Sequence, residues 1–340
     1  MARAFVTGIT GQDGSYLAEA LLDRGWEVHG LATSPPASGA STTPAGMPSA
    51  SPASASPASG VTIHVGDLTD APFLASVLDE VRPDLVVNLA GISSVAASWA
   101  DPVRCAEVTG LAAVTLLELA WRLQERHGIP VRWLQASSAE IFGQPKLAAG
   151  EAISERTPIA PVSPYGAAKA FAHVTTGVYR TRGMHASTVI LFNHESPRRP
   201  HAFVTRKITS TVAAIVQGRA DKLVLGNQDA RRDWGWAPDY VEAMVRAAEH
   251  DRADDFVVAT GVAHSVGDFV AAAFAGAGIR DWASLVETDP ALVRPTDPAV
   301  LVGDASKARA ELGWTPTVGF EELVARMVAH DLGHSTDSAD

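Results

Sequence analysis

The chain has 340 residues, 46% of them hydrophobic and 19% charged, which indicates a folded globular protein with one large domain or two lobes. Its formal net charge is -11. Nucleic-acid binding requires a basic face, so this charge argues against a nucleic-acid partner.

The cysteine content and the length of the apolar runs indicate the cellular compartment of the protein. Cys105 is the single cysteine, so no internal disulfide can form. No apolar run approaches the ~18 residues expected of a membrane span, and no secretory signal follows Met1. We therefore expect a cytoplasmic protein that enters no membrane, and we expect no bound metal.

A glycine-rich loop lies near the start of the chain. Residues 4–7 predict a short buried strand, and the amphipathic pattern of residues 16–24 predicts a helix. Between them, glycines let the backbone turn sharply and approach a pyrophosphate, and the helix start offers free N–H groups. This placement predicts dinucleotide binding, with a merely tight turn as the alternative. The residues expected to bind the cofactor here are Gly8, Gly11, Gln12, Asp13 and Gly14.

The second predicted strand, residues 27–32, should end beside the adenosine ribose. An acidic residue there would bind the 2′-hydroxyl, and an arginine would accept a 2′-phosphate, but the chain has Thr33 and Ser34. A run of Ala, Ser, Pro, Gly and Thr then covers residues 34–60, with too little apolar surface to offset the entropy of ordering. We interpret it as a flexible surface insertion, and a lid over the cofactor is the alternative.

The following segments alternate between strand and helix. Asp67 and Leu68 come directly after a strand and are expected to contact the cofactor, with Asp67 at the adenine. The alternation predicts a doubly wound parallel sheet of the Rossmann type. The predicted strands are 61–65, 85–91, 131–136 and 187–192, and the predicted helices are 71–81 and 101–127.

Beyond residue 193 the alternation loosens, which predicts a second, smaller substrate-binding lobe. Its predicted elements are helices 203–217, 265–277, 304–312 and 320–330, strand 222–225 and a polar turn at 231–235. Helix 239–250 and strand 256–260 are expected to return to the first sheet. The predicted division is therefore 1–192 with 239–260 as the dinucleotide-binding domain, and 193–238 with 261–334 as the substrate-binding lobe.

A set of polar residues is expected at the carboxyl end of the strand that begins at Val131. Ser138 and Glu140 follow this strand, where open α/β sheets carry their chemistry. Tyr165 and Lys169 are four residues apart, which places them on one helix face. An ammonium beside a phenol should lower the pKa of the phenol from about 10. Tyr165 could then take a proton from a substrate hydroxyl while a hydride leaves the same carbon.

Several segments resemble the extended short-chain dehydrogenase/reductase superfamily and, more narrowly, the GDP-mannose 4,6-dehydratase family. They cover nearly the whole chain except residues 33–60. The glycines and the Tyr-x-x-x-Lys spacing are shared by the superfamily, whereas the blocks at Asn193 and Arg232 are specific to the family. The matching segments are TGITGQDGSYL (7–17), GDLTD (66–70), SPYGAAK (163–169), LFNHESPRR (191–199), FVTRKI (203–208) and RDWG (232–235).

The resemblance implies NADP as the cofactor and a reaction in three stages. Tyr165 would deprotonate the sugar 4-hydroxyl as hydride leaves C4, and Ser138 would assist. Glu140 would remove the C5 proton, water would leave C6, and hydride would return to C6. Lys169 would bind the nicotinamide ribose and tune Tyr165. The resemblance further implies that Asn193, Lys207, Arg232 and Arg294 bind the nucleotide sugar.

The sequence departs from the family pattern at two places. Thr33 and Ser34 stand where the family has arginines that bind the 2′-phosphate and join subunits, so NAD is an alternative cofactor. For the same reason we expect either a homodimer or a homotetramer. Ala139 replaces a hydroxyl residue between Ser138 and Glu140, as in many sugar epimerases.

Two other functions remain open from the sequence. A 4-epimerase or decarboxylase of the same superfamily would use Ser138, Tyr165 and Lys169 but would need no proton from C5. Glu140 favours dehydration over these activities. A nucleotide-binding homologue without turnover is the other alternative, and the intact set of four residues argues against it.

Overall fold

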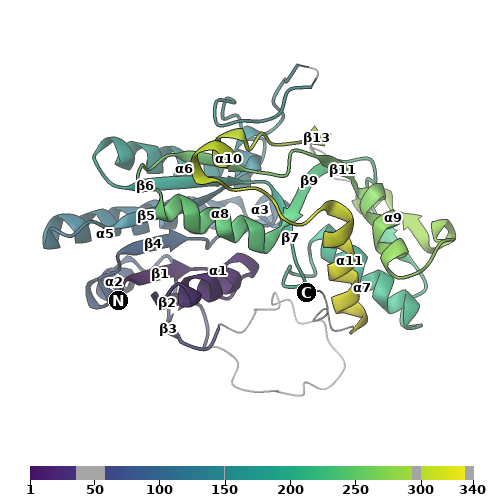
Figure 1. Ribbon diagram of the computed structural model, residues 1–340, viewed down its shortest axis with the longest axis horizontal. Helices are drawn as coiled ribbons and strands as arrows, with labels where there is room; N and C mark the ends of the chain where they lie inside the picture. The colour runs from purple at the N-terminus through teal and green to yellow at the C-terminus, as the bar shows by residue number, and fades with distance from the viewer. Residues whose placement is uncertain (36–57, 149, 293–299, 334–340) are drawn as a thin grey trace.

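The computed structural model describes residues 1–35, 58–148, 150–292 and 300–333. A sheet of seven parallel strands forms the larger part of the molecule (Figure 1). The chain order reverses between β1 and β4, which is the position where doubly wound sheets bind their ligands. In order across the sheet, the strands are β10 (Asp255–Val258), β6 (Ala186–Leu191), β5 (Arg132–Ser138), β4 (Leu85–Asn88), β1 (Arg3–Thr7), β2 (Glu27–Ala32) and β3 (Val61–Val65).

Helices cover both faces of this sheet, which explains why its strands read as nearly continuous apolar runs. One face carries α1 (Gln12–Asp23), α8 (Ala237–Glu249) and α10 (Ser306–Leu312). The other face carries α2 (Ala71–Val81), α5 (Ala112–His127) and α6 (Pro164–Thr181). The short helices α3 (Val95–Ala100) and α4 (Pro102–Cys105) and the π-helical segment η1 (Ala106–Leu111) precede α5.

The remaining elements form a smaller lobe with its own apolar core beside the sheet (Figure 1). Its four-stranded sheet contains β7 (Asn193–Glu195), β9 (Arg231–Trp236), β11 (Ala263–Ser265) and β13 (Val300–Leu301). Its helices are α7 (Val204–Val216), α9 (Val266–Gly276) and α11 (Phe320–Leu332). The strands β8 (Leu223–Leu225) and β12 (Val286–Thr288) pair separately, and η2 (Ala139–Phe142), η3 (Ala283–Leu285) and η4 (Pro290–Leu292) are single 3₁₀ turns.

The fold class and the return of β10 to the first sheet are confirmed. Helix α1 begins at Gln12 rather than at Tyr16, so the glycine loop leads directly into it. The proposed insertion at 34–60 falls mainly on residues 36–57, which lie outside the described residues. Among the residues that the structure does describe, no helix is long and apolar enough to cross a bilayer.

The prediction of a polar turn at 231–235 is wrong, because these residues form strand β9 in the middle of the small sheet. Polar residues can be buried in this strand because they have hydrogen-bond partners within the protein. Asp233 is fully buried, and its carboxylate accepts hydrogen bonds from Thr260 N (2.8 Å) and Oγ1 (2.6 Å), Gly261 N (2.9 Å) and Gly303 N (3.3 Å). Burial nevertheless raises the pKa of Asp233.

Helix α10 also differs from its expected place in the smaller lobe. It packs against α8 and β10, and Ala308 and Leu312 join the core on that face of the large sheet. The amphipathic pattern predicted the helix correctly but carried no information about which core it would cover.

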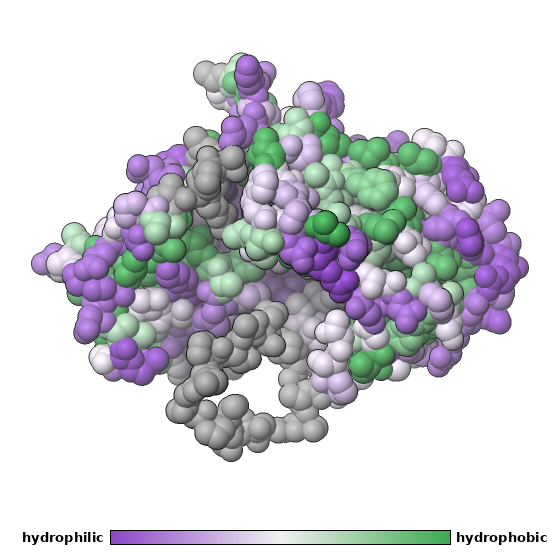
Figure 2. Space-filling model, turned by 180° about the vertical axis from the view of Figure 1, so that it is seen from behind, coloured by the Kyte–Doolittle hydropathy of each residue, from purple (hydrophilic) through white to green (hydrophobic). Residues whose placement is uncertain are grey.

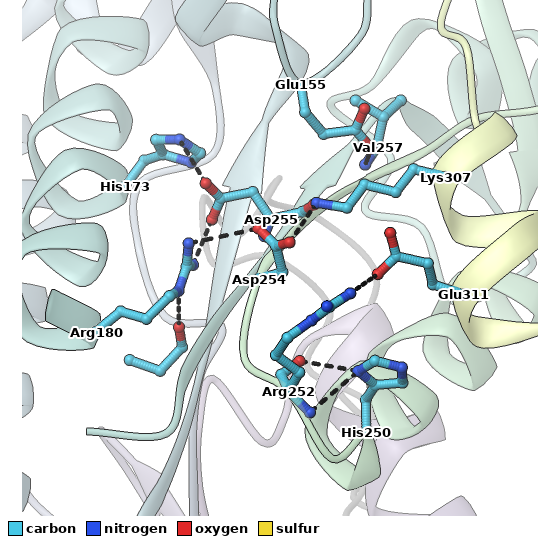
Figure 3. A network of polar contacts seen from close by, with 11 residues as sticks. Glu155, His173, Arg180, His250, Arg252, Asp254, Asp255, Val257, Lys307 and Glu311 are labelled. Carbon is cyan, nitrogen blue, oxygen red and sulfur yellow. Dashed lines mark hydrogen bonds and ion pairs between the residues drawn. The ribbon is translucent and has the colours of Figure 1, made fainter. Parts of the chain in front are cut away.

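Side chains cover the outer edge of β10, the edge strand of the large sheet (Figure 3). The backbone N–H of Val257 donates to Glu155 Oε1 (2.7 Å), and Lys307 Nζ donates to the carbonyl oxygen of Asp255 (2.9 Å). Arg180 pairs with the Asp255 carboxylate at 2.6 Å. The contacts of Glu155 and Lys307 occupy backbone groups of β10 that would otherwise be free to pair with a strand of another chain.

Candidate active site

The glycine loop lies between β1 and α1, at the carboxyl edge of the large sheet (Figure 1). Gly8 has φ of +71°, and a Cβ on Gly14 would lie 2.1 Å from the Gly8 carbonyl oxygen. Packing of the helix on the loop therefore requires glycine at these two positions. A Cβ on Gly11 would meet only that same oxygen, at 3.2 Å. The space beside Gly11 and the start of α1 together fit the diphosphate of a dinucleotide.

The side chains of Gln12 and Asp13 reach across to the segment that follows β6. Gln12 Nε2 donates to the carbonyl oxygen of His194 (3.1 Å), and Ser196 Oγ donates to Gln12 Oε1 (2.8 Å). Asp13 Oδ2 lies 2.9 Å from His194 Nε2. Because these side chains are engaged within the protein, the predicted cofactor contact of both residues would involve the backbone of the helix start.

Asp67 and Leu68 lie after β3 but differ in exposure. The Asp67 side chain is 51% exposed, and Oδ1 accepts from the backbone N–H and the hydroxyl of Thr69, both at 2.8 Å. These hydrogen bonds lower the pKa of Asp67, and Arg104 lies 3.4 Å from the other oxygen. Leu68 is buried in the apolar core. Asp67 is thus the one of the two whose side chain is accessible to a ligand.

The structure brings Ser138, Glu140 and Tyr165 together where β5, η2 and α6 meet. The backbone N–H of Glu140 donates to Ser138 Oγ (3.3 Å), and Ser138 also shares a hydrogen bond with Tyr165. A Cβ on Gly166 would lie 2.5 Å from the carbonyl oxygen of Glu140, so glycine at this position lets η2 pack against the start of α6. The cap of α6 fixes that start, because the backbone N–H of Gly166 donates to Ser163 Oγ at 3.0 Å.

The expected lowering of the pKa of Tyr165 is not found. Burial, together with the nearby Glu140 carboxylate, raises the pKa of Tyr165 to about 12, although the Ser138 hydrogen bond and the Arg199 charge oppose the shift. Lys169 Nζ lies 6.0 Å from the centre of the Tyr165 ring and donates to the carbonyl oxygen of Ala136 (2.9 Å). Burial lowers the pKa of Lys169 to about 8. The phenol is therefore protonated at neutral pH in the chain without ligands.

The predicted substrate residues are distributed over the smaller lobe. Asn193 opens β7 and pairs with Trp234 of β9, the strand that also carries Arg232. The Arg232 side chain is largely buried, and Nη1 donates to the carbonyl oxygen of Arg231 (2.8 Å). Lys207 lies half-buried in the first turn of α7. Arg294 lies outside the described residues.

Arg199 is a cation of the site to which the sequence analysis assigned no role. Its side chain is 15% exposed, and Nε lies 3.2 Å from Glu195 Oε2. Its charge lowers the pKa of both Tyr165 and Asp13. Its position in the Asn193 block could have indicated it.

In the described ranges, no three His, Cys, Asp or Glu side chains are placed to share a metal ion.

The chain is similar to known proteins over nearly its whole length. A family model described as GDP-mannose 4,6 dehydratase matches residues 5–327. GDP-mannose 4,6 dehydratase 1 of Arabidopsis thaliana is 46% identical, over 97% of this chain and 89% of its own length. GDP-mannose 4,6-dehydratase of Yersinia enterocolitica is 39% identical, over 100% of this chain and 96% of its own length.

Solved structures share the fold. UDP-glucose 4-epimerase of Thermus thermophilus, in complex with NAD, gives a TM-score of 0.79 at 29% identity, over 97% of this chain and 99% of that chain. RMD of Pseudomonas aeruginosa, complexed with NADPH, gives a TM-score of 0.77 at 23% identity, over 98% and 99% of the two chains. At the latter identity the likeness shows the fold alone.

Proposed function

The chain belongs to the GDP-mannose 4,6-dehydratase family, and we propose that it converts GDP-mannose to GDP-4-keto-6-deoxy-mannose through Tyr165, Ser138, Glu140 and Lys169. The observation that carries this assignment of residues is the position of Glu140. The backbone N–H of Glu140 donates to Ser138 Oγ (3.3 Å), and Ser138 shares a hydrogen bond with Tyr165, so one sugar ring could contact both Glu140 and Tyr165. Such a pair can act on neighbouring carbons of one substrate.

Tyr165 and Ser138 carry the first step. NADP, when bound, would supply the acceptor for the C4 hydride and the donor for C6, and its oxidised nicotinamide would add positive charge to the pocket. Tyr165 takes the proton of the 4-hydroxyl as hydride leaves C4. Its pKa of about 12 makes the phenolate costly in the free chain, so the positive charge of Arg199, which lowers this pKa, matters for this step. Lys169, with Nζ 6.0 Å from the centre of the Tyr165 ring, is proposed to assist. Ser138 stabilises the phenolate by its hydrogen bond.

Glu140 carries the second step. Oxidation at C4 makes the C5 proton acidic, and Glu140 removes it. The bond between C6 and its hydroxyl oxygen then breaks. Ala139 is apolar, so Glu140, which now holds the C5 proton, is the acid that protonates the leaving oxygen to give water. To complete the 6-deoxy product, hydride would return to C6, and C5 would receive a proton that Glu140 regains from solvent. Tyr165 would release the proton of the 4-hydroxyl to solvent.

The smaller lobe is proposed to bind the nucleotide sugar. Asn193, Lys207 and Arg232, with Arg294, would hold the diphosphate and its neighbouring hydroxyls. Charge-assisted hydrogen bonds of this kind are needed because the chain as a whole is acidic. The division into a dinucleotide-binding domain and a substrate-binding lobe follows from this arrangement. A cytoplasmic location stays a prediction, which fractionation of cells can test.

Incubation with GDP-mannose tests the proposed function. Purified protein supplied with NADP should form a 4-keto-6-deoxy sugar nucleotide without net consumption of the cofactor. In deuterium oxide, the product should carry deuterium at C5. Formation of the C4 epimer without C5 exchange would instead identify an epimerase.

We expect weak discrimination between NADP and NAD, although the family favours NADP. Thr33 and Ser34 follow β2, are exposed and offer no cation to a 2′-phosphate. Each missing charge-assisted hydrogen bond is worth about 1.5–3 kcal/mol. Titration of the apo-protein with both cofactors should therefore show dissociation constants within about tenfold of each other. A preference for NADP beyond about a hundredfold would contradict the expectation and would require a cation from elsewhere.

We propose that the protein forms a homodimer through an apolar strip on α6 and the segment before α5. Phe171, Val174 and Val178 are about half exposed and lie on one face of α6. Val103 and Leu111 are exposed on α4 and η1, and η1 packs against α6. Figure 2 shows apolar side chains spread over the side of the molecule that carries the large sheet. A strip of this kind can pair with its own copy about a two-fold axis.

Phe171→Asp should convert the dimer to a monomer, because it places a carboxylate in the centre of the paired strip. Sedimentation analysis checks this. Val216→Asp, at an exposed valine on α7, is the matched control and should leave the dimer intact. A monomeric wild type, or dissociation only in the control, would contradict the assignment of this interface.

A further inference from the structure

A polar contact joins two segments that are far apart in the sequence, the start of α1 and strand β7. His194 meets Asp13 at 2.9 Å, and Gln12 contacts the same strand. His194 follows Asn193, the predicted substrate residue, while Asp13 lies in the first turn of the helix that follows the glycine loop. The contact therefore connects the proposed cofactor site to the proposed substrate site.

The hydrogen-bond partners of His194 determine its protonation. Nδ1 lies 2.7 Å from the carbonyl oxygen of Phe192, which can only accept, so Nδ1 carries a proton. Nε2 lies 2.9 Å from Asp13 Oδ2, which also accepts when ionised. Both ring nitrogens must then donate, which makes His194 an imidazolium paired with a carboxylate.

The electrostatics of the surroundings agree with this ion pair. Burial opposes ionisation of Asp13, but the charge and hydrogen bond of His194 outweigh it and lower the pKa of Asp13 to about 2. Burial likewise disfavours charged His194, yet Asp13 raises its pKa overall. Arg199, Lys169 and the titratable Tyr16 of α1 also interact electrostatically with the pair, and the Tyr240 ring stacks on the imidazole with 4.8 Å between centroids.

The position of Asp13 explains why neutralisation matters. The amino end of a helix attracts anions, and the space beside Gly11 fits a diphosphate there. A carboxylate in the same turn, with a side chain only 22% exposed, would repel that diphosphate if it stood alone.

We propose that His194 is a positioning residue that neutralises Asp13, so that the start of α1 accepts the cofactor diphosphate, and that fixes the glycine loop against the strand carrying Asn193. This inference rests on the proposed dinucleotide-dependent function. It concerns binding of the cofactor in the absence of substrate, so its test is separate from the test of dehydration.

Three variants test the proposal through the dissociation constant of NAD, measured by calorimetry on the apo-protein. NAD is the probe because it lacks the 2′-phosphate, which itself titrates near neutral pH. His194→Gln keeps a donor but removes the charge, and it should weaken binding by about tenfold or more. Asp13→Asn should bind NAD with a dissociation constant within about threefold of that of wild type. The variant with both substitutions, Asp13→Asn and His194→Gln, should bind NAD as tightly as Asp13→Asn does.

A pH series on the wild-type protein provides a measurement that does not depend on folding of the His194→Gln variant. Because the pKa of His194 is raised, the imidazolium is present below that pKa and is lost as the pH rises through it. Asp13 stays ionised throughout, so wild-type affinity for NAD should fall as the pH rises. Lys169 also titrates, near its pKa of about 8. The Asp13→Asn variant should keep the fall in NAD affinity that Lys169 causes, and it should not show the fall that His194 causes.

The outcomes separate this inference from the proposed function. Failure of wild type to bind any nicotinamide dinucleotide would reject both. Equal binding by wild type and a folded His194→Gln variant, or a double variant as weak as His194→Gln, would reject the role of His194 alone. A pH dependence that is unchanged in Asp13→Asn would also reject it.

Discussion

Replacement of Tyr165 by phenylalanine should abolish turnover while leaving cofactor binding largely intact. In the proposed mechanism the phenol takes the proton of the sugar 4-hydroxyl, and loss of a positioned acid or base typically costs on the order of 10²–10⁴ in rate. The proposed cofactor contacts, at the glycine loop and the start of α1, do not involve this hydroxyl. The ring of the variant keeps its packing with Cys105 and Ala168 in the small apolar cluster at the site.

Two measurements check this result, the rate of 4-keto product formation and the dissociation constant of NADP. Tyr179→Phe is the matched control, because Tyr179 lies on the same helix but its hydroxyl contacts Glu118, away from the site. The control should retain turnover. Near-normal product formation by Tyr165→Phe would remove Tyr165 from the mechanism.

Replacement of Glu140 by glutamine should separate oxidation from dehydration. Glutamine keeps the shape of the side chain but cannot take the C5 proton, so the rate of dehydration should fall on the order of 10²–10⁴. Oxidation at C4 needs Tyr165 and not Glu140. It should become easier, because removing the carboxylate removes one cause of the raised pKa of Tyr165.

The variant given GDP-mannose and NADP should therefore accumulate reduced cofactor, visible as nicotinamide absorbance, with little 6-deoxy product. Glu125→Gln, at an exposed position on α5, should behave as wild type. Dehydration by Glu140→Gln at the wild-type rate would show that another group is the base. Loss of both absorbance and product would assign Glu140 to the oxidation step instead.

The large sheet could be predicted from the sequence because its strands carry their own signal. Strands such as β4 are buried on both faces and read as unbroken apolar runs, and glycine spacing places the loop between β1 and α1. The position of Ser138 and Glu140 at the carboxyl end of β5 followed from the rule that open α/β sheets carry their chemistry there. The spacing of four residues placed Tyr165 and Lys169 on one helix face. These signals are local in the sequence or common to all sheets of this type.

Features that depend on tertiary partners could not be predicted. The sequence of β9 is polar, so it does not predict a buried strand. Asp233 can be buried in this strand because its carboxylate accepts hydrogen bonds from Thr260, Gly261 and Gly303. The raised pKa of Tyr165 depends on its burial and on Glu140. The pairing of Asp13 with His194 joins two segments that are far apart in the sequence, and no sequence pattern predicts that they are in contact.

The order in which the chain visits its two cores affects how the protein can be divided. After β6, the elements β7, α7 and β9 belong to the smaller lobe, and α8 and β10 then belong to the large sheet. Helix α9 lies in the smaller lobe again, α10 packs on the large sheet, and α11 lies in the smaller lobe. Neither core is therefore encoded by one continuous stretch of gene. A single recombination crossover after β6 would replace the substrate lobe together with α8 and β10, and so would also exchange part of the cofactor-binding sheet. Transfer of a new sugar specificity onto this scaffold requires several separate inserts, each joined at a point where the chain passes from one core to the other.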